Sequence, residues 1–283
     1  MTIIRPDVAL HCGAHRLDTS RPLIMGIVNV TPDSFSDGGR FVATGAAVAH
    51  ARALVAAGAD ILDIGGESTR PGAEPVPLAE ELDRVLPVIE ALADEGVPLS
   101  IDTYKPEVMS AAVAAGASLI NDVFALRQPG ALEAAAANDA GVCLMHMQGT
   151  PQTMQVDPYY ADVVGEVAAF LCERIAACEA AGIDRERIVV DPGFGFGKTT
   201  AHNIALLNGL GEIIRRTGRP LLAGLSRKSV LGRITTREKA ADRVAASVAS
   251  ALVAVQKGAR ILRVHDVDAT LDMVRVWQAL EVT

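Results

Sequence analysis

The sequence is poor in aromatic residues, in cysteine and in positive charge, and each shortage excludes something. Aromatic side chains make up 4% of the 283 residues against 50% apolar residues, so a core must consist mainly of Val, Ile, Leu and Ala. The four cysteines, Cys12, Cys143, Cys172 and Cys178, form no CxxC pair, and we expect reduced thiols without disulfides. The net charge of −8 argues against nonspecific attraction to nucleic acid or to anionic membranes.

Long hydrophobic runs are also missing. No run reaches the roughly 18 apolar residues of a membrane span. The N-terminal stretch MTIIRPDVALHCG carries Arg5, Pro6 and Asp7 where a signal peptide needs an unbroken apolar segment. We therefore expect a soluble cytoplasmic protein.

What the chain has instead is a series of eight short apolar runs, each of which ends in polar residues. The runs lead into Asn29, into Glu67 and Thr69, into Asp102, into Asn121, into His146, into Asp191, into Ser226 and Lys228, and into Arg263 and His265. Ala-rich amphipathic stretches separate them. This alternation predicts an α/β fold, a (β/α)8 TIM barrel, in which the polar strand ends meet in one pocket at the carboxyl end of the barrel.

A (β/α)8 barrel uses about 250 residues, so we expect one catalytic domain over residues 1–283. Residues 1–21 are expected to form an N-terminal hairpin that closes the barrel floor. Periodicity and capping residues predict the helices, with boundaries uncertain by a few residues: 44–60, 77–96, 106–116, 129–139, 159–181, 202–217, 238–257 and 268–280. Loops 31–40 and 67–77 are expected to be lids.

One side of the pocket is suited to an anion. Arg263 and His265 are two residues apart on the last strand, so their side chains point to the same side of the barrel. With Asn29 on the adjacent strand and Arg70 on a flanking loop they could bind a phosphate-like group. Alternatively, Arg263 pairs with Asp266 or another carboxylate and His265 is an ordinary hydrogen-bonded residue.

The opposite wall carries Asp102, Asn121 and Asp191 at three strand ends. Inward-facing carboxylates need partners, because an unpaired buried charge is costly. The partner could be a metal, Lys228, or a ligand rich in N–H donors such as the guanidine-like edge of a pterin or purine. The structural alternative is a salt bridge between Asp191 and Lys228.

Two Gly- or Ser-containing segments lie near this wall. DPGFGFGKT is one residue short of a nucleotide P-loop, and we interpret its glycines as backbone freedom around Phe194 and Phe196, with Phe196 a stacking face. Lys198 is predicted to be a solvated loop lysine. SRKS, residues 226–229, precedes a short helix and could hold a substrate carboxylate, or it could simply cap that helix. His146 is predicted to be a polar wall residue, without metal-ligand spacing.

Taken together, the motifs resemble dihydropteroate synthase, the folate-pathway enzyme family targeted by sulfonamides. The resemblance runs from MGIVNVTPDSFSDGGRF through DILDIGGESTRPGA, IDTYKPEV, GASLINDV, CLMHMQGTPQTMQ, DPGFGFGKT and GLSRKSVLG to RVHDV. It implies condensation of 6-hydroxymethyl-7,8-dihydropterin pyrophosphate with 4-aminobenzoate (pABA) to 7,8-dihydropteroate and pyrophosphate, with Mg2+ as cofactor and a homodimer as the assembly.

The resemblance also implies roles for single residues. The residues implied to act in catalysis are Asp102, Lys228, Arg263 and His265. Those implied to hold the pterin are Asp102, Asn121, Asp191, Lys228, Met145 and Phe196. Pyrophosphate would be held by Asn29, Arg70, Arg263 and His265, with Asn29 also a metal ligand. The pABA pocket would comprise Thr69, Arg70, Phe35, Phe196, Ser226 and Ser229.

Two other functions fit parts of the sequence. A methyltetrahydrofolate-binding methyltransferase shares the pterin-holding Asp and Asn, but it should lack the NVTPDSFSDGG loop and the RVHDV pair. A noncatalytic pterin-binding protein should lack the anion site. The helix containing VAASVASALVAV can bury more than one face, through either dense barrel packing or a dimer interface.

Overall fold

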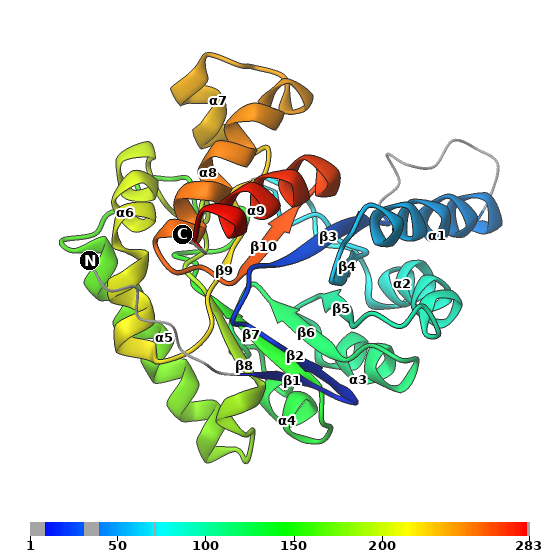
Figure 1. The fold of residues 1–283 in the computed structure, drawn as a ribbon. Helices are drawn as coiled ribbons and strands as arrows, with labels where there is room; N and C mark the ends of the chain where they lie inside the picture. Colours follow the sequence, from blue (N-terminus) through cyan, green and yellow to red (C-terminus); the bar gives the residue numbers. More distant parts are fainter. Residues whose placement is uncertain (1–8, 31–39, 71, 282–283) are drawn as a thin grey trace.

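The computed structural model describes residues 9–30, 40–70 and 72–281, and it consists of parallel strands surrounded by helices (Figure 1). Eight strands form one sheet in the order β8-β7-β6-β5-β4-β3-β10-β9. Their bounds are β3 Leu23–Asn29, β4 Ile61–Gly65, β5 Leu99–Asp102, β6 Leu119–Asp122, β7 Gly141–Met145, β8 Ile188–Asp191, β9 Leu222–Ala223 and β10 Ile261–Val264. A parallel bridge between Val190 and Leu221 joins the two outer strands, which closes the ring. The predicted single-domain (β/α)8 barrel is confirmed.

Helices follow the strands and cover the outside of the ring (Figure 1). Their bounds are α1 Arg40–Ala56, α2 Leu78–Leu92, α3 Pro106–Ala114, α4 Ala131–Ala136, α5 Val163–Ala180, α6 Thr200–Thr217, α7 Ser229–Thr235, α8 Val244–Gln256 and α9 Val267–Glu281, with short 3-10 turns η2 Arg185–Arg187 and η3 Ala240–Arg243.

The helix predicted over residues 44–60 begins four residues earlier, at Arg40, and two further helix predictions differ from the structure at their starts. The helix predicted over residues 159–181 begins at Val163, because the Asp162 side chain accepts a hydrogen bond from the Gly165 N–H and caps it. The helix predicted over residues 238–257 is divided into η3 and α8. None of these differences moves a strand end.

A small hairpin lies at the amino-terminal ends of the strands. Its strands, β1 Leu10–Cys12 and β2 His15–Leu17, pair antiparallel, and the Gly13 N–H between them donates to the Asp139 carbonyl at 2.9 Å. Leu10 and Cys12 are completely buried, and they cluster with interior residues at the bottom of the barrel such as Ile61 and Leu222. The hairpin therefore covers the barrel at this end.

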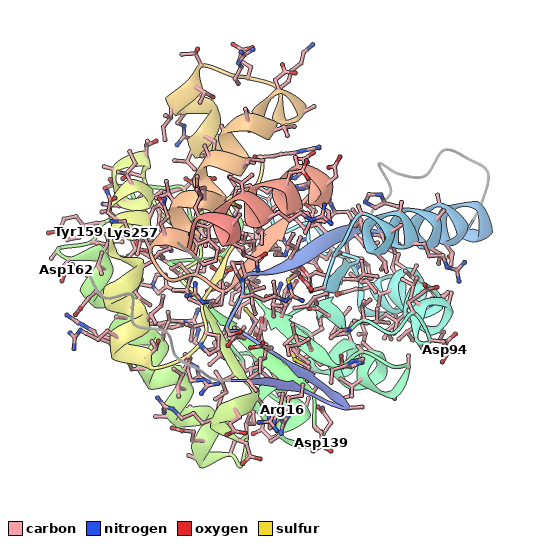
Figure 2. All side chains as sticks on the ribbon, viewed as in Figure 1. Arg16, Asp94, Asp139, Tyr159, Asp162 and Lys257 are labelled. Atoms are coloured by element: carbon pink, nitrogen blue, oxygen red, sulfur yellow. The ribbon has the colours of Figure 1, made fainter. Side chains whose placement is uncertain are left out.

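The main core lies between the strands and the helices. In α2, for example, Val85, Val88 and Ile89 are fully buried against the sheet, at the spacing of one helix face. Charged side chains such as Asp94 and Lys257 point outward (Figure 2). None of the helices in the described ranges is long and apolar enough to span a membrane. All four cysteine thiols are free.

Candidate active site

The polar strand ends lie next to one another at the carboxyl end of the barrel. In the strand register Gly65 is opposite Asp102, Asp102 is opposite Asn121, and Met145 is opposite Asp191. Because side chains alternate along a strand, these positions all face the barrel interior. In the predicted wall, Asp102 and Asn121 are thus neighbours, and β7 with Met145 separates Asn121 from Asp191.

Arg263 reaches this wall and is held by two carboxylates. Its Nε donates to Asp63 Oδ2 at 2.5 Å, and its Nη2 donates to Asp102 Oδ2 at 2.7 Å. Asp63 is completely buried on β4, where it also accepts hydrogen bonds from Ser100 Oγ at 2.6 Å and from Asn121 Nδ2 at 3.2 Å. We call Asp63, Asp102 and Arg263 the central ion cluster.

Two carboxylates share one guanidinium in the central ion cluster, so it holds a net negative charge when all groups are ionised. Burial raises the pKa of Asp102, the Arg263 guanidinium opposes this rise, and the Asp63 carboxylate adds to it. Burial disfavours the charge of Arg263 as well, yet the carboxylates outweigh it and raise the pKa of Arg263, which stays a cation.

Asp63 is a site residue that the sequence reading missed. It lies inside the apolar run ILDIG, where a polar residue attracts less notice than one at a strand end. Its position could have identified it: Asp63 lies two residues before Gly65 on β4, and residues two apart on a strand face the same side, here the barrel interior.

Asp191 and Lys228 face the same space without touching in the described structure. Asp191 accepts the Gly193 N–H at 2.7 Å, and the Lys228 ammonium donates to the Phe194 carbonyl and lies 4.7 Å from the centre of the Phe196 ring. Burial raises the pKa of Asp191, which Lys228 partly offsets, and burial lowers the pKa of Lys228 to about 8. The alternative of a direct salt bridge is therefore wrong for this structure, and both polar groups remain available to a ligand.

The segment from Gly193 to Gly197 forms a fixed turn rather than a freely moving one. Gly193 and Gly197 have φ angles of +68° and +65°, and a Cβ at either position would collide with the main-chain carbonyl of His146 or Gln148. Glycine is required at both positions because another main-chain segment lies too close for a Cβ and because the φ angle is in the left-handed region. This explanation replaces our interpretation that the glycines give the backbone freedom. Phe194 is fully buried and Phe196 is half-buried.

Lys198 is not a solvated loop lysine, so this prediction was wrong. Its side chain is buried, and Nζ contacts His146 Nδ1 at 3.0 Å and donates to the Phe196 carbonyl at 2.9 Å. The turn folds back on itself, which carries Lys198 inward behind Phe196. His146 is buried as a polar wall residue, and burial together with Lys198 lowers its pKa to about 3, so it is neutral at pH 7.

The anion side consists of residues from β3, β10 and the adjacent loops. Ser226 Oγ accepts the His265 backbone N–H at 3.2 Å and lies 3.0 Å from His265 Nδ1. Burial, assisted by Arg263 and Arg227, lowers the pKa of His265 to about 4, so His265 is a neutral imidazole at pH 7. Arg263 does not pair with Asp266, because Arg227 takes that carboxylate at 3.0 and 2.5 Å. The alternative that Arg263 pairs with another carboxylate is confirmed, since it binds Asp63 and Asp102.

Asn29 and Arg70 are exposed at this side of the mouth. Asn29 ends β3 opposite Gly65, next to the position of Asp102 on the following strand. Within residues 9–30, 40–70 and 72–281, no three His, Cys, Asp or Glu side chains are grouped as a metal site. An exposed amide oxygen does fit Mg2+, which usually takes few protein ligands and completes its shell with phosphate oxygens and water.

The base of the loop after β4 is tied to its neighbours. The Lys105 ammonium binds both Glu67 and Glu81, and the Tyr104 hydroxyl donates to Glu67 at 2.8 Å. Further along, the Gly72 N–H donates to the Pro151 carbonyl at 3.2 Å. Among the residues assigned to pABA, Thr69 is half-buried on this loop, Ser226 is buried and Ser229 is exposed at the start of α7. Phe35 and most of the predicted lid 31–40 lie outside the described residues.

These residues form one mouth with an acid- and amide-lined wall, an aromatic face, and a side that carries the paired Arg263, neutral His265 and exposed Arg70. The described members of the predicted site reach it from all eight strand ends: Asn29, Thr69, Arg70, Asp102, Asn121, Met145, Asp191, Phe196, Ser226, Lys228, Ser229, Arg263 and His265. The individual ligand roles stay predictions.

Comparisons with known proteins show which family this chain resembles in sequence. Residues 25–265 match the family model described as pterin binding enzyme. The dihydropteroate synthase of Neisseria meningitidis serogroup B is 55% identical over 273 residues, which cover 95% of this chain and 96% of that protein.

Solved structures give the same result. The Xanthomonas albilineans dihydropteroate synthase with 4-aminobenzoic acid has a TM-score of 0.92 at 57% identity, covering 98% of this chain and 99% of the other. The Burkholderia cenocepacia dihydropteroate synthase complexed with 7,8-dihydropteroate has a TM-score of 0.90 at 54% identity, covering 97% of both chains.

Proposed function

This chain belongs to the pterin binding enzyme family, as a dihydropteroate synthase, and from that premise we propose how its own residues perform the reaction. It condenses 6-hydroxymethyl-7,8-dihydropterin pyrophosphate with pABA to give 7,8-dihydropteroate and pyrophosphate. The observation that carries this conclusion is identity above half over nearly the full length of synthases whose structures include one bound to dihydropteroate.

The pterin is proposed to bind at the wall of Asp102, Asn121 and Asp191. A carboxylate matches the paired N–H groups of the pterin's guanidine-like edge, while an Asn amide serves a ring donor and a ring acceptor together. Lys228 adds a cationic donor close to Asp191, and Phe196 with Met145 supplies the apolar faces for the flat ring. The raised pKa of Asp191 supports this assignment, because a donor-rich ligand would supply the partners that the free carboxylate lacks.

The pyrophosphate is proposed to bind toward Asn29, Arg70, Arg263 and His265. Neutral His265 can donate one ring N–H to a phosphate oxygen when Ser226 donates to its Nδ1. Asn29 would hold Mg2+ together with pyrophosphate oxygens. When bound, the metal supplies Lewis-acid stabilisation of the charge on the leaving pyrophosphate.

Catalysis is proposed to rest on positioning and electrostatics. As the bond between the pterin methylene carbon and the pyrophosphate oxygen breaks, positive charge develops on the pterin and negative charge on the leaving group. We assign stabilisation of the first charge to Asp102 and of the second to Arg263. The pABA amine is neutral at pH 7, so it attacks the methylene carbon without a strong base, held through its carboxylate by the Ser226–Ser229 segment, with Thr69 and Phe35 shaping the pocket.

The test is pyrophosphate release by the purified protein given the dihydropterin pyrophosphate, Mg2+ and pABA, with a control lacking pABA. We expect release that depends on pABA and yields one dihydropteroate per pyrophosphate. Binding of the pterin without release would require withdrawal of the roles of Asn29, Arg263 and His265. Release independent of pABA would refute the condensation.

The Mg2+ assignment needs a separate test. Asn29→Ala should raise the Mg2+ concentration for half-maximal activity while pterin binding without Mg2+ is unchanged, because only the metal ligand is removed. An unchanged Mg2+ requirement would remove Asn29 from the metal site.

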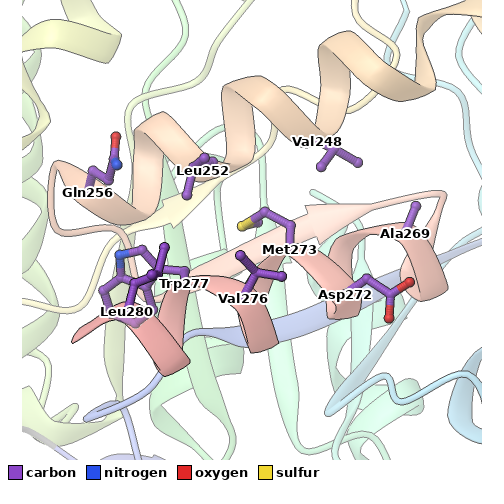
Figure 3. Close-up of a pocket in the computed structure, with 9 residues that line it drawn as sticks. All are labelled: Val248, Leu252, Gln256, Ala269, Asp272, Met273, Val276, Trp277 and Leu280. Carbon is purple, nitrogen blue, oxygen red and sulfur yellow. The ribbon is translucent and has the colours of Figure 1, made fainter. Parts of the chain in front are cut away.

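We also propose that the protein is a homodimer that pairs through α8 and α9. These helices border an apolar groove of about 380 Å³ lined by Leu252, Met273, Val276, Trp277 and Leu280, among others (Figure 3). Val276 and Leu280 are 63% and 71% exposed, which is high for large aliphatic side chains on adjacent turns. A second copy of the chain would bury this surface.

Sedimentation velocity tests the dimer. Val276→Glu should convert a dimer into a monomer without loss of the folded signal, whereas Arg275→Ala, next to it on α9, should leave the dimer intact. A wild-type monomer would refute the proposal.

A cytoplasmic location is proposed as well. Free thiols at all four cysteines support it, since reduced cysteines are the rule in that compartment. Fractionation of the cells that make the protein would test it, and recovery in a membrane or extracellular fraction would contradict it.

A further inference from the structure

The turn between β8 and α6 holds four consecutive carbonyl groups that all accept hydrogen bonds from side chains. The carbonyl of Phe194 accepts from Lys228, and that of Gly195 accepts from Gln155 at 2.7 Å. The carbonyl of Phe196 accepts from Lys198, and that of Gly197 accepts from the Tyr160 hydroxyl, each at 2.9 Å. One of these donors, Lys198, follows the turn directly, while Gln155, Tyr160 and Lys228 reach it from other segments. Together they fix the turn that presents the Phe196 ring.

Lys198 differs from the other three donors in being a charged group behind the turn. Its residue is 1% exposed, whereas Gln155 is exposed and Lys228 faces the site. Its ammonium has three acceptors: the Phe196 carbonyl, His146 Nδ1 at 3.0 Å and the His146 carbonyl at 3.4 Å. An ammonium has three N–H groups, so every one of them has a partner.

The two residues that Lys198 connects belong to neighbouring walls of the site. His146 directly follows Met145, whose side chain lies beside Asp191, and Phe196 carries the ring below the Lys228 ammonium. Phe196, Met145 and Met154 pack in one small cluster at the mouth. Lys198 therefore holds the main chain on both sides of this cluster while its own side chain stays out of the pocket.

We propose that Lys198 is a positioning residue for the pterin site, which fixes the Phe196 ring at the distance and tilt that the flat substrate needs. This inference rests on the proposed pterin-binding function. A burial cost opposes any buried ammonium, and here burial lowers the pKa of Lys198 to about 7 although Asp191 raises it. A neutral apolar side chain would avoid this cost, so the presence of a buried amine donor is explained by its hold on the turn.

The experiment compares Lys198→Met, which keeps the length and removes the donors, with Gln155→Ala, which frees the neighbouring carbonyl from the solvent side. We expect Lys198→Met to raise the KM for the dihydropterin pyrophosphate on the order of 10-fold, with kcat changed no more than about 3-fold, because substrate binding and not chemistry is affected. Gln155→Ala should change neither parameter more than about 2-fold, since water can replace an exposed donor.

A double-mutant cycle separates positioning from a general structural role. If Lys198 acts through the Phe196 ring, then Lys198→Met in a Phe196→Ala background should change the pterin KM less than about 2-fold. Additive effects of the two substitutions would overturn the proposal, as would a loss confined to kcat. Circular dichroism and melting curves of each variant establish that it is folded; if Lys198→Met does not fold, Lys198→Gln takes its place with the same criteria.

Direct titration of the dihydropterin pyrophosphate by calorimetry accompanies the kinetics. If the wild-type protein binds the pterin but forms no dihydropteroate, the proposed function fails while weaker pterin binding by Lys198→Met still supports the role of Lys198. If wild type and Lys198→Met bind the pterin equally well, the role of Lys198 is refuted whatever the activity.

Discussion

Asp63→Asn should move the acid limb of the pH–rate profile to lower pH with little change in stability. In the central ion cluster, Asp63 and Asp102 bind different nitrogens of one guanidinium, so their carboxylates repel each other. Burial raises the pKa of Asp102, and the charge of Asp63 raises it further. Removing that charge while keeping the shape lowers the pKa of Asp102, which then stays ionised to a lower pH.

The magnitude follows from the geometry. Carboxylates on two nitrogens of one guanidinium lie roughly 5–6 Å apart, and at an effective dielectric constant of about 20 their repulsion is roughly 3 kcal/mol, or about 2 pKa units. The substitution also removes a charged hydrogen bond worth about 1.5–3 kcal/mol. The two effects nearly cancel in the free energy of unfolding, whereas only the first acts on the pKa of Asp102.

The assay is kcat/KM for the dihydropterin pyrophosphate at saturating pABA from acid to neutral pH, together with melting temperatures. We expect the acid limb to move down by about 1–2 pH units and the melting temperature to change by a few degrees at most. Asp60→Asn is the control: Asp60 pairs with Arg21 and accepts the Ile24 N–H at the other end of the barrel, so it should lose stability without moving the limb. Coincident acid limbs in Asp63→Asn and wild type would refute the shared-guanidinium explanation.

Three further predictions concern the same site. Asp102→Asn and Arg263→Ala should each lower turnover far more than pterin affinity in steady-state and binding measurements, because both stabilise charge that develops in the transition state; equal losses in both quantities would contradict this. The basic limb of kcat/KM should fall as pH rises past about 8, where Lys228 loses its proton, and Lys228→Arg should abolish that limb because arginine remains charged. Gly193→Ala should lower the melting temperature more than Gly96→Ala, since both have positive φ but only Gly193 lies against a main-chain carbonyl; equal shifts would show that backbone strain alone acts.

The strand ends of the site could be predicted from the sequence because strand position and side-chain direction are linked. A polar residue that closes an apolar run, such as Asp102 or Asn121, must face the mouth once the runs form a parallel barrel. Local sequence therefore located the wall. It did not reveal that Arg263 on β10 reaches past β3 to Asp63 on β4, because that contact joins residues 200 positions apart.

The loops were less predictable because their environment is set by the tertiary fold. Lys198 follows a run of glycines, which favours an exposed lysine in any isolated segment, and only the close approach of the turn to the His146 carbonyl buries it. Asp266 follows Arg263 closely in the sequence, but Arg227 from the preceding strand end takes its carboxylate. In both cases a contact with a distant segment decides whether the side chain is buried or with which residue it pairs.

The hairpin β1–β2 has a consequence for the order of events during turnover. Because Leu10 and Cys12 plug the amino-terminal end of the barrel, everything must enter and leave by the mouth. With the proposed site assignments, the pterin would lie deepest and pABA between it and the exit, so the joined product would have to leave with its pABA end first. A bound pABA analogue that cannot react would therefore block release of the pterin below it, because the barrel would have a single opening for substrates and products.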